Sequence, residues 1–354
     1  MIKYRIDRLC ELLDNNQAML VTSDANRFYL TGFNSDCGSA LIFGGCAYLL
    51  VDFRYYERAR NEAMCEVIES HGDKELIELL KKNDINEIFV ETEQMTIAER
   101  KRLCRALGGV EISNDRKCED VILQMRQIKT EQEFEFIRKA QKMTDDTFDY
   151  ILPRISAGRT ERKVMLDMEF YMRSLGSEGV SFDFIVVSGK NSSLPHGVPT
   201  DKVIEKGDFV TMDFGAVVNG YHSDMTRTVV IGSVSDEQRL VYDTVLKAQN
   251  ASFAVMKSGV RGCDVDKAAR DVINSAGFEG CFGHALRHSV GLEIHESPVC
   301  SPNFKKPLKS GTVMTVEPGI YIDGRFGVRI EDMVFVTDNG FENITKSDKS
   351  LIIL

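Results

Sequence analysis

Two aspartates stand on either side of an Asn-Gly turn in the second half of the chain, and this spacing restricts the local fold strongly. The alternating runs Phe209–Val217 and Tyr221–Ile231 are joined by Asn219-Gly220, which is a strong signal for a β-hairpin. In that hairpin Asp213 and Asp224 lie on neighbouring strands and on the same face, opposite or diagonal to each other. Two carboxylates so placed repel each other unless a cation or a proton lies between them. The alternative is that both are ordinary surface aspartates.

A second pair of carboxylates repeats this arrangement. The loop Asp323-Gly324-Arg325 separates the strand-like runs Val313–Ile322 and Val328–Val336. A hairpin centred on this loop places Glu317 opposite Glu331 on one face. Both glutamates have apolar neighbours, among which an unpaired charge is costly. Two hairpins that each present a carboxylate pair therefore predict one centre with four carboxylates.

Histidines are concentrated in the same part of the chain, where five of the six fall between residues 196 and 295. The segment 282–298 contains His284, His288 and His295, and His196 lies in a Pro-His-Gly loop. A lone histidine such as His222 is more simply interpreted as an ordinary core or surface residue. One histidine and four carboxylates suit two divalent ions about 3.5–4 Å apart, which together can activate a water and polarise a carbonyl. Oxygen-rich ligands favour manganese, although cobalt, zinc or iron would also be accepted.

Composition and charge exclude several classes of protein. The net charge of −10 and the absence of a basic face argue against nucleic-acid binding. The N-terminus lacks the apolar core of a signal peptide, and no apolar run approaches the roughly 20 residues that span a bilayer. The nine scattered cysteines include no C-x-x-C pair, which is typical of reduced thiols in a cytosol. We therefore expect a cytoplasmic protein without membrane or nucleic-acid partners.

The 354 residues suggest two domains. Residues 1–125 alternate between strand-like runs and helical stripes, which predicts an α/β domain. The boundary is expected near Arg126–Thr130, where Thr130 and Glu133 form a capping box that opens a helix. Residues 126–354 combine four expected helices with hairpins, which predicts an α+β domain of helices packed on antiparallel strands.

These residues together resemble the metal set of the pita-bread metallopeptidases, in the branch of aminopeptidase P and prolidase. The motifs that carry the resemblance are Asp213 with Asp224 eleven residues later, His288 within H-x-x-x-H-x-V-G-L-E-x-H-E, Glu317 within E-P-G-x-Y, and Glu331 within V-R-I-E-D. The segments Asn26–Phe33 and Asp52-x-Arg54-Tyr55 are similar to the creatinase-type first domain of that branch. Because the resemblance covers essentially the whole chain, the expected architecture is a creatinase-like domain followed by a pita-bread catalytic domain.

The resemblance also implies roles for individual residues. Asp213 would hold one metal ion through both oxygens, and Asp224 and Glu331 would bridge the two ions. His288 and Glu317 would complete the second ion's ligands. Glu317 would act in addition as general base and acid, taking a proton from water and passing it to the leaving nitrogen.

Other residues are implied at the substrate and around the ligands. The histidines 196, 284 and 295 match residues that line the family's substrate site. His295 would hydrogen-bond the carbonyl and steady the oxyanion that forms from it. Arg329 would orient a ligand carboxylate, and Tyr321 is a weaker candidate for such support.

The resemblance implies cleavage of the bond between the first residue of a peptide and a following proline. An Xaa-Pro aminopeptidase is the favoured interpretation, and an Xaa-Pro dipeptidase (prolidase) is the alternative. A methionine aminopeptidase and a metal-free relative remain as minor alternatives. The resemblance further implies a homodimer in which one subunit's first domain borders the other subunit's site.

One residue departs from the family pattern. The position before the metal histidine is commonly small in the family and often glycine, whereas Arg287 occupies it here. Its long cationic side chain could point outward without consequence, or it could crowd the site and disturb the ligands. The choice bears on metal preference and rate more than on the class of reaction.

Overall fold

The computed structural model describes all residues from 1 to 354, and they divide into two units, Met1–Arg126 and Gln127–Leu354. No helix in either unit combines the length and the apolar composition that are needed to cross a membrane. All nine cysteines are unpaired.

The first unit is built on a six-stranded mixed sheet with the strand order β4-β3-β2-β1-β5-β6. Its strands are β1 (Gln17–Val21), β2 (Ser39–Phe43), β3 (Cys46–Val51), β4 (Glu66–Glu69), β5 (Glu87–Val90) and β6 (Glu111–Ser113). Its helices are α1 (Ile2–Cys10), α2 (Asp24–Thr31), α3 (Phe53–Glu62), α4 (Lys74–Lys82), α5 (Ile97–Leu107) and α6 (Lys117–Gln127). Alternate residues of the strands face opposite sides, so Leu50 packs with α4 and α5 whereas Leu49 and Val51 pack with α3. This is the α/β architecture that the sequence predicts.

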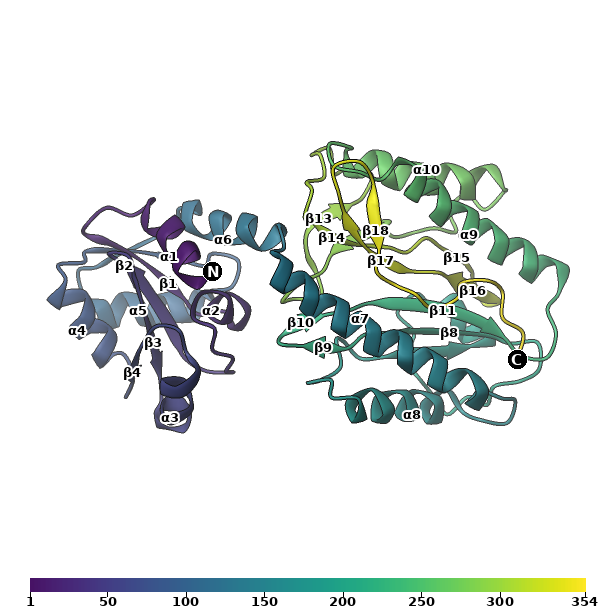
Figure 1. Ribbon diagram of the computed structural model, residues 1–354, viewed down its shortest axis with the longest axis horizontal. Coiled ribbons are helices and arrows are strands. Elements are labelled where there is room, and N and C mark those ends of the chain that lie inside the picture. Colours follow the sequence, from purple (N-terminus) through teal and green to yellow (C-terminus); the bar gives the residue numbers. More distant parts are fainter. The chain divides into compact units, whose positions relative to one another are not determined.

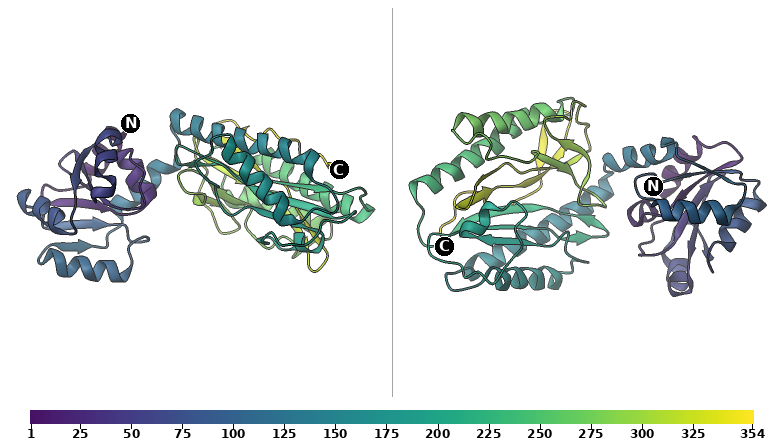
Figure 2. Two further views of the ribbon diagram at one scale, coloured as in Figure 1. Left: turned by 90° about the horizontal axis from the view of Figure 1, so that it is seen from below. Right: turned by 180° about the vertical axis from the view of Figure 1, so that it is seen from behind.

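Four long helices enclose the strands of the second unit. They are α7 (Glu131–Ile151), α8 (Glu161–Ser174), α9 (Asp236–Val255) and α10 (Gly262–Ser275). Within this unit α7 and α8 lie on one side of the strands, and α9 and α10 lie on the other (Figures 1 and 2). A capping box at Thr130 begins α7, as the sequence predicts, and a second capping box at Ser235 begins α9.

The strands between these helices are all antiparallel. A three-stranded sheet has the order β11-β8-β7, and a five-stranded sheet has the order β13-β12-β14-β17-β18. Two short hairpins, β9–β10 and β15–β16, complete the set. The bounds are β7 (Ile185–Ser188), β8 (Phe209–Phe214), β9 (Val217–Val218), β10 (Tyr221–His222), β11 (Met225–Val230), β12 (Arg287–Ser289), β13 (Glu296–Cys300), β14 (Val313–Val316), β15 (Gly319–Ile322), β16 (Phe326–Arg329), β17 (Asp332–Val336) and β18 (Phe341–Asn343), with short 3-10 helices at Leu152–Arg154 and Gly189–Ser193.

The second predicted hairpin is interrupted at the position of its glutamates. Strand β14 pairs with β17 and β15 pairs with β16 in one continuous register, so Glu317 and Glu331 face each other across the gap between the two ladders. Pro318 follows Glu317 and has no N–H to donate to a ladder. The backbone N–H of Glu331 instead donates to Thr226 of β11, and that of Glu317 donates to Leu286. The interruption therefore connects the hairpin to β11 of the three-stranded sheet, and both glutamates lie at this junction.

Candidate metal centre

Three buried carboxylates meet where these sheets join. Asp213 belongs to β8 and is opposite Thr226 of β11, while Asp224 immediately precedes β11. One carboxylate oxygen from each of these aspartates and one from Glu331 all lie within 4.8 Å of one another. The two predicted hairpins thus contribute to one cluster.

Two further residues predicted as ligands border this cluster. The Nε2 atom of His288 is 3.7 Å from Asp224 Oδ2 and 3.8 Å from Glu317 Oε1. Its Nδ1 atom lies 3.1 Å from the carbonyl oxygen of Ser289, to which it donates a hydrogen bond. This contact selects the tautomer in which Nε2 carries a lone pair toward the carboxylates. Burial, with the nearby His295 and Arg287, lowers the pKa of His288 to about 3, so the ring is neutral.

The cluster has the chemistry of a cation site. Three buried oxygens, Asp213 Oδ1, Asp224 Oδ1 and Glu331 Oε1, have no hydrogen-bond partner. Burial and then the charge of Glu331 raise the pKa of Asp224 and of Glu317 well above the usual range. Burial and then the charge of Asp213 raise the pKa of Glu331 to about 7. Buried carboxylates with unpaired oxygens and raised pKa values fit divalent ions, which would satisfy the oxygens and neutralise the charge.

Arg329 and Thr226 hold two of the carboxylates in place. One guanidinium nitrogen of Arg329 donates to Asp213 Oδ2 at 2.6 Å, and its Nε donates to the hydroxyl of Thr226 at 3.0 Å. The same hydroxyl donates to Glu331 Oε2 at 2.7 Å. Because each carboxylate keeps a second oxygen free of hydrogen bonds, this support orients the ligands without occupying them.

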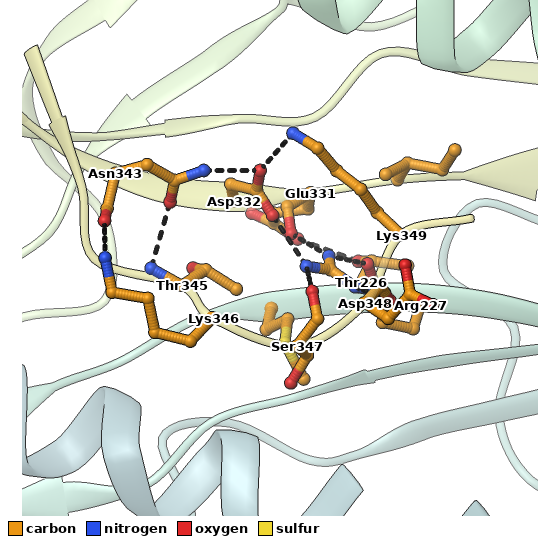
Figure 3. Close-up of polar contacts among 12 residues, drawn as sticks. Thr226, Arg227, Glu331, Asp332, Asn343, Thr345, Lys346, Ser347, Asp348 and Lys349 are labelled. Carbon is orange, nitrogen blue, oxygen red and sulfur yellow. Dashed lines mark hydrogen bonds and ion pairs between the residues drawn. The ribbon is translucent and has the colours of Figure 1, made fainter. Parts of the chain in front are cut away.

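A buried ion-pair network fixes the backbone on which these ligands stand, and sequence reasoning missed it. Arg227 bonds the carbonyl oxygens of Thr226 and Glu331 and pairs with Asp332 Oδ1 at 2.7 Å (Figure 3). The other oxygen of Asp332 accepts from Lys349 at 2.7 Å and from Asn343 at 2.9 Å. Arg227 directly follows Thr226 in the sequence, and Asp332 directly follows Glu331. This adjacency to residues of the centre is the signal that could have identified them.

The carboxylates open into a cavity of about 320 Å³. The predicted substrate residues His196 and His295 line it, and both side chains are exposed. The His295 ring lies 4.4 Å from that of His288 between centroids. The rest of the wall is largely apolar, with Phe182, Phe184, Ile185, Val198, Pro199 and Ile294, and it also includes Gly197 and the acidic Asp183.

His284 is not among the residues that line this cavity. It lines an adjoining hollow together with Arg287, His288 and His295, which border both spaces. Its Nδ1 contacts the carbonyl of Ala285 at 2.8 Å, and its Nε2 lies 3.0 Å from the hydroxyl of Tyr321, which in turn accepts from Arg329 at 2.9 Å. Burial, followed by the charge of Arg287, lowers the pKa of His284 to about 3. His284 therefore helps to position the hydroxyl of Tyr321, and this hydroxyl helps to position the guanidinium of Arg329.

Arg287 points into the centre. Its Nε lies 3.0 Å from Glu317 Oε1, and the side chain is 17% exposed. The guanidinium lines the main cavity beside the carboxylates. Of the two orientations that the sequence leaves open, the structure has the inward one.

Known proteins resemble this chain over its full length. The model described as metallopeptidase family M24 matches residues 135–338, and that of the creatinase/prolidase N-terminal domain matches residues 5–128. An Xaa-Pro dipeptidase of Pyrococcus furiosus is 37% identical over 99% of this chain and 100% of its own. The structure of an Xaa-Pro dipeptidase from Bacillus anthracis has a TM-score of 0.95 at 38% identity, and each chain is covered completely. That of an X-Pro aminopeptidase from Thermotoga maritima has a TM-score of 0.92 at 36% identity, covering 99% of this chain and 100% of its own.

Proposed function

This chain belongs to metallopeptidase family M24 and is a metallo-exopeptidase, and on that basis we propose that it is an Xaa-Pro dipeptidase. It would hydrolyse the single bond of a dipeptide whose second residue is proline. The observation that carries the proposal is the convergence of Asp213, Asp224 and Glu331, with His288 and Glu317 beside them, at one end of a small cavity.

The residues present divide the chemistry among them. Asp213, Asp224, His288, Glu317 and Glu331 would hold two divalent ions, which when bound supply an activated water and polarise the scissile carbonyl. Glu317 takes the proton of the attacking water and gives it to the proline nitrogen, which needs one because it leaves as an amine. His295 donates to the carbonyl oxygen as negative charge grows there, and His196, which lines the same cavity, contacts the substrate. Arg329 keeps Asp213 oriented throughout.

The apolar part of the cavity supports proline as the second residue. Six apolar residues line this part of the cavity, beside Asp183 and Gly197, and a proline ring presents an apolar surface without an N–H that would need a partner. The volume of about 320 Å³ is at the low end of the roughly 300–1,000 Å³ usual for small-molecule pockets. A small cavity suits a dipeptide better than a longer peptide.

The choice of dipeptidase differs from the aminopeptidase that the sequence analysis favours. Relatives named Xaa-Pro dipeptidase or prolidase, which match the whole chain, support the alternative instead. A peptidase named X-Pro aminopeptidase is nearly as similar, so the two activities need a direct test.

The experiment measures hydrolysis of Ala-Pro, Ala-Pro-Gly, Met-Ala-Ser and creatine, after chelation and after return of manganese. We expect hydrolysis of Ala-Pro with a kcat/KM at least about tenfold above that for Ala-Pro-Gly, and none without metal. Preference for the tripeptide would replace the dipeptidase by the aminopeptidase. Activity on Met-Ala-Ser or creatine alone would reject both.

Two finer features are part of the same proposal. Manganese is the proposed ion because four of the five ligand residues offer carboxylate oxygens. A homodimer is proposed from the family resemblance, and its mass in solution by light scattering tests it. The choice of manganese is tested by metal analysis of protein purified without added ions.

A further inference from the structure

Arg287 has a backbone conformation that arginine rarely adopts. Its φ is +148°, in the region that favours glycine, and it lies within strand β12. The other two non-glycine residues with positive φ are Asp84 and Asn219, which are of the types that tolerate such angles in turns. Such a conformation persists only where the surroundings enforce it, and it is most often found at functional sites.

The guanidinium lies where the second ion's ligands face each other. Glu317 Oε1 is 3.0 Å from Arg287 Nε and 3.8 Å from His288 Nε2. The same carboxylate has a second cationic neighbour, because its Oε2 is 3.9 Å from Arg329 Nε. Asp213 Oδ1, Asp224 Oδ1 and Glu331 Oε1, by contrast, have no hydrogen-bond partner. The two halves of the centre, Asp213 with Asp224 and Glu331 on one side and His288 with Glu317 on the other, thus differ before any ion enters.

Electrostatics separates these halves further. The half made by Asp213, Asp224 and Glu331 has three carboxylates, and Arg329 neutralises one of them. The ligands that belong to the second ion alone are His288 and Glu317, and Arg287 already contacts Glu317, whereas Asp224 and Glu331 would be shared by both ions. A divalent ion between His288 and Glu317 would be repelled by the guanidinium and would have to displace it from Oε1.

We propose that Arg287 competes with the second metal ion, so that the centre binds one ion tightly at Asp213, Asp224 and Glu331 and a second ion weakly between His288 and Glu317. This inference rests on the proposed metal centre. It makes two-ion occupancy, and with it peptidase activity, depend on the free concentration of metal. Arg287 acts here as a positioning residue that adjusts metal affinity.

The test is a titration of metal-free protein with Mn²⁺, following free Mn²⁺ by electron paramagnetic resonance and bound metal by equilibrium dialysis. We expect the wild type to bind one equivalent tightly and a second with a Kd at least about tenfold higher. In Arg287→Gly and in Arg287→Met the second Kd falls at least about tenfold, because both variants remove the charge. The spin-coupled signal of paired Mn²⁺ then appears at a lower metal concentration.

Three comparisons keep the test decisive. Arg287→Gly also removes the backbone strain, whereas Arg287→Met keeps a long side chain at the strained position, so agreement between them assigns the effect to the charge. Arg261→Met, at an exposed arginine paired with Asp264, changes the net charge equally and should leave both Kd values unchanged. Two equally tight equivalents in the wild type, or an unchanged Kd ratio in both Arg287 variants, would overturn the role of Arg287 and leave the peptidase proposal standing. Absence of any bound metal would overturn both.

Discussion

Thr226 connects two residues of the centre through one hydroxyl, which accepts from Arg329 and donates to Glu331. A Thr226→Val variant keeps the shape of the side chain but leaves the buried Nε of Arg329 and Oε2 of Glu331 without the hydroxyl as partner. We expect a loss of about 1–3 kcal/mol in the free energy of unfolding, together with weaker metal binding. Thr228→Val is the matched control, since its hydroxyl lies on the same strand and bonds Thr211 and the Arg329 carbonyl, but no carboxylate. Equal metal affinity in the two variants would contradict the role of Thr226.

Glu317 is the one residue assigned both a metal ion and a proton. In Glu317→Gln the amide oxygen can still bind a cation, but the side chain no longer accepts a proton. We expect kcat for Ala-Pro to fall by about 10²–10⁴, as is usual for loss of a general base, with the tightly bound Mn²⁺ equivalent retained. Steady-state kinetics and metal analysis measure this, with Glu279→Gln, an exposed glutamate, as control. A variant with near-normal kcat would remove Glu317 from proton transfer.

At the scale of elements, the pair Arg227–Asp332 ties β11 to β17 beneath the ligands. Burial by itself would raise the pKa of Asp332, but the charges of Arg227 and Lys349 lower it, so the carboxylate is ionised. Asp332→Asn leaves Arg227 buried without its counter-charge, and we expect a loss of about 3–5 kcal/mol in urea unfolding. Glu237→Gln breaks the exposed pair with Arg325 and should leave the urea midpoint unchanged. Equal stability of the two variants would show that the network is not structural.

Several elements were predictable because their signals are local. The capping boxes at Thr130 and Ser235 mark α7 and α9, and the two hairpins follow from their turns and alternation. Helix α2 carries a weaker local signal, because it has only eight residues and its N-cap, Ser23, makes no side-chain hydrogen bond to the helix. The division of the second hairpin into two ladders depends on contacts with Thr226 and Leu286, which are distant in sequence.

The same distinction applies to the site. Periodicity and turn position place the four carboxylates on common faces, so their convergence could be anticipated. The direction of Arg287 could not, because it depends on a φ of +148° that its residue type disfavours. The position of His284 outside the lining of the main cavity likewise depends on a contact with Tyr321 of β15, which is distant in sequence.

At the scale of the whole molecule, each unit has its own hydrophobic core, and all the proposed ligands belong to residues 127–354. Metal removal should therefore act on the second unit directly. An ion at a free concentration one hundred times its Kd stabilises the state that binds it by about 2.7 kcal/mol. The first unit then serves as an internal control within the same chain.

The stabilisation by metal should also depend on pH. Burial and neighbouring charges raise the pKa of Asp224 and Glu317 well above the usual range and that of Glu331 to about 7. A carboxyl whose pKa is raised on folding favours the folded state at low pH, and this benefit is lost as pH rises through the folded pKa. The metal-free second unit should therefore lose stability from about pH 4.5, near the unfolded pKa of glutamate, to about pH 7.

Bound ions remove this penalty, since they neutralise the carboxylates that the metal-free protein must protonate. We expect the difference in Tm between Mn²⁺-loaded and chelated protein to be small near about pH 5 and larger near about pH 8. Differential scanning calorimetry at both values measures it, and the transition of residues 1–126 should not respond to chelation. Only competition between protons and metal ions for these carboxylates links metal affinity to pH in this window. An equal difference in Tm at the two pH values would therefore mean that the two do not compete.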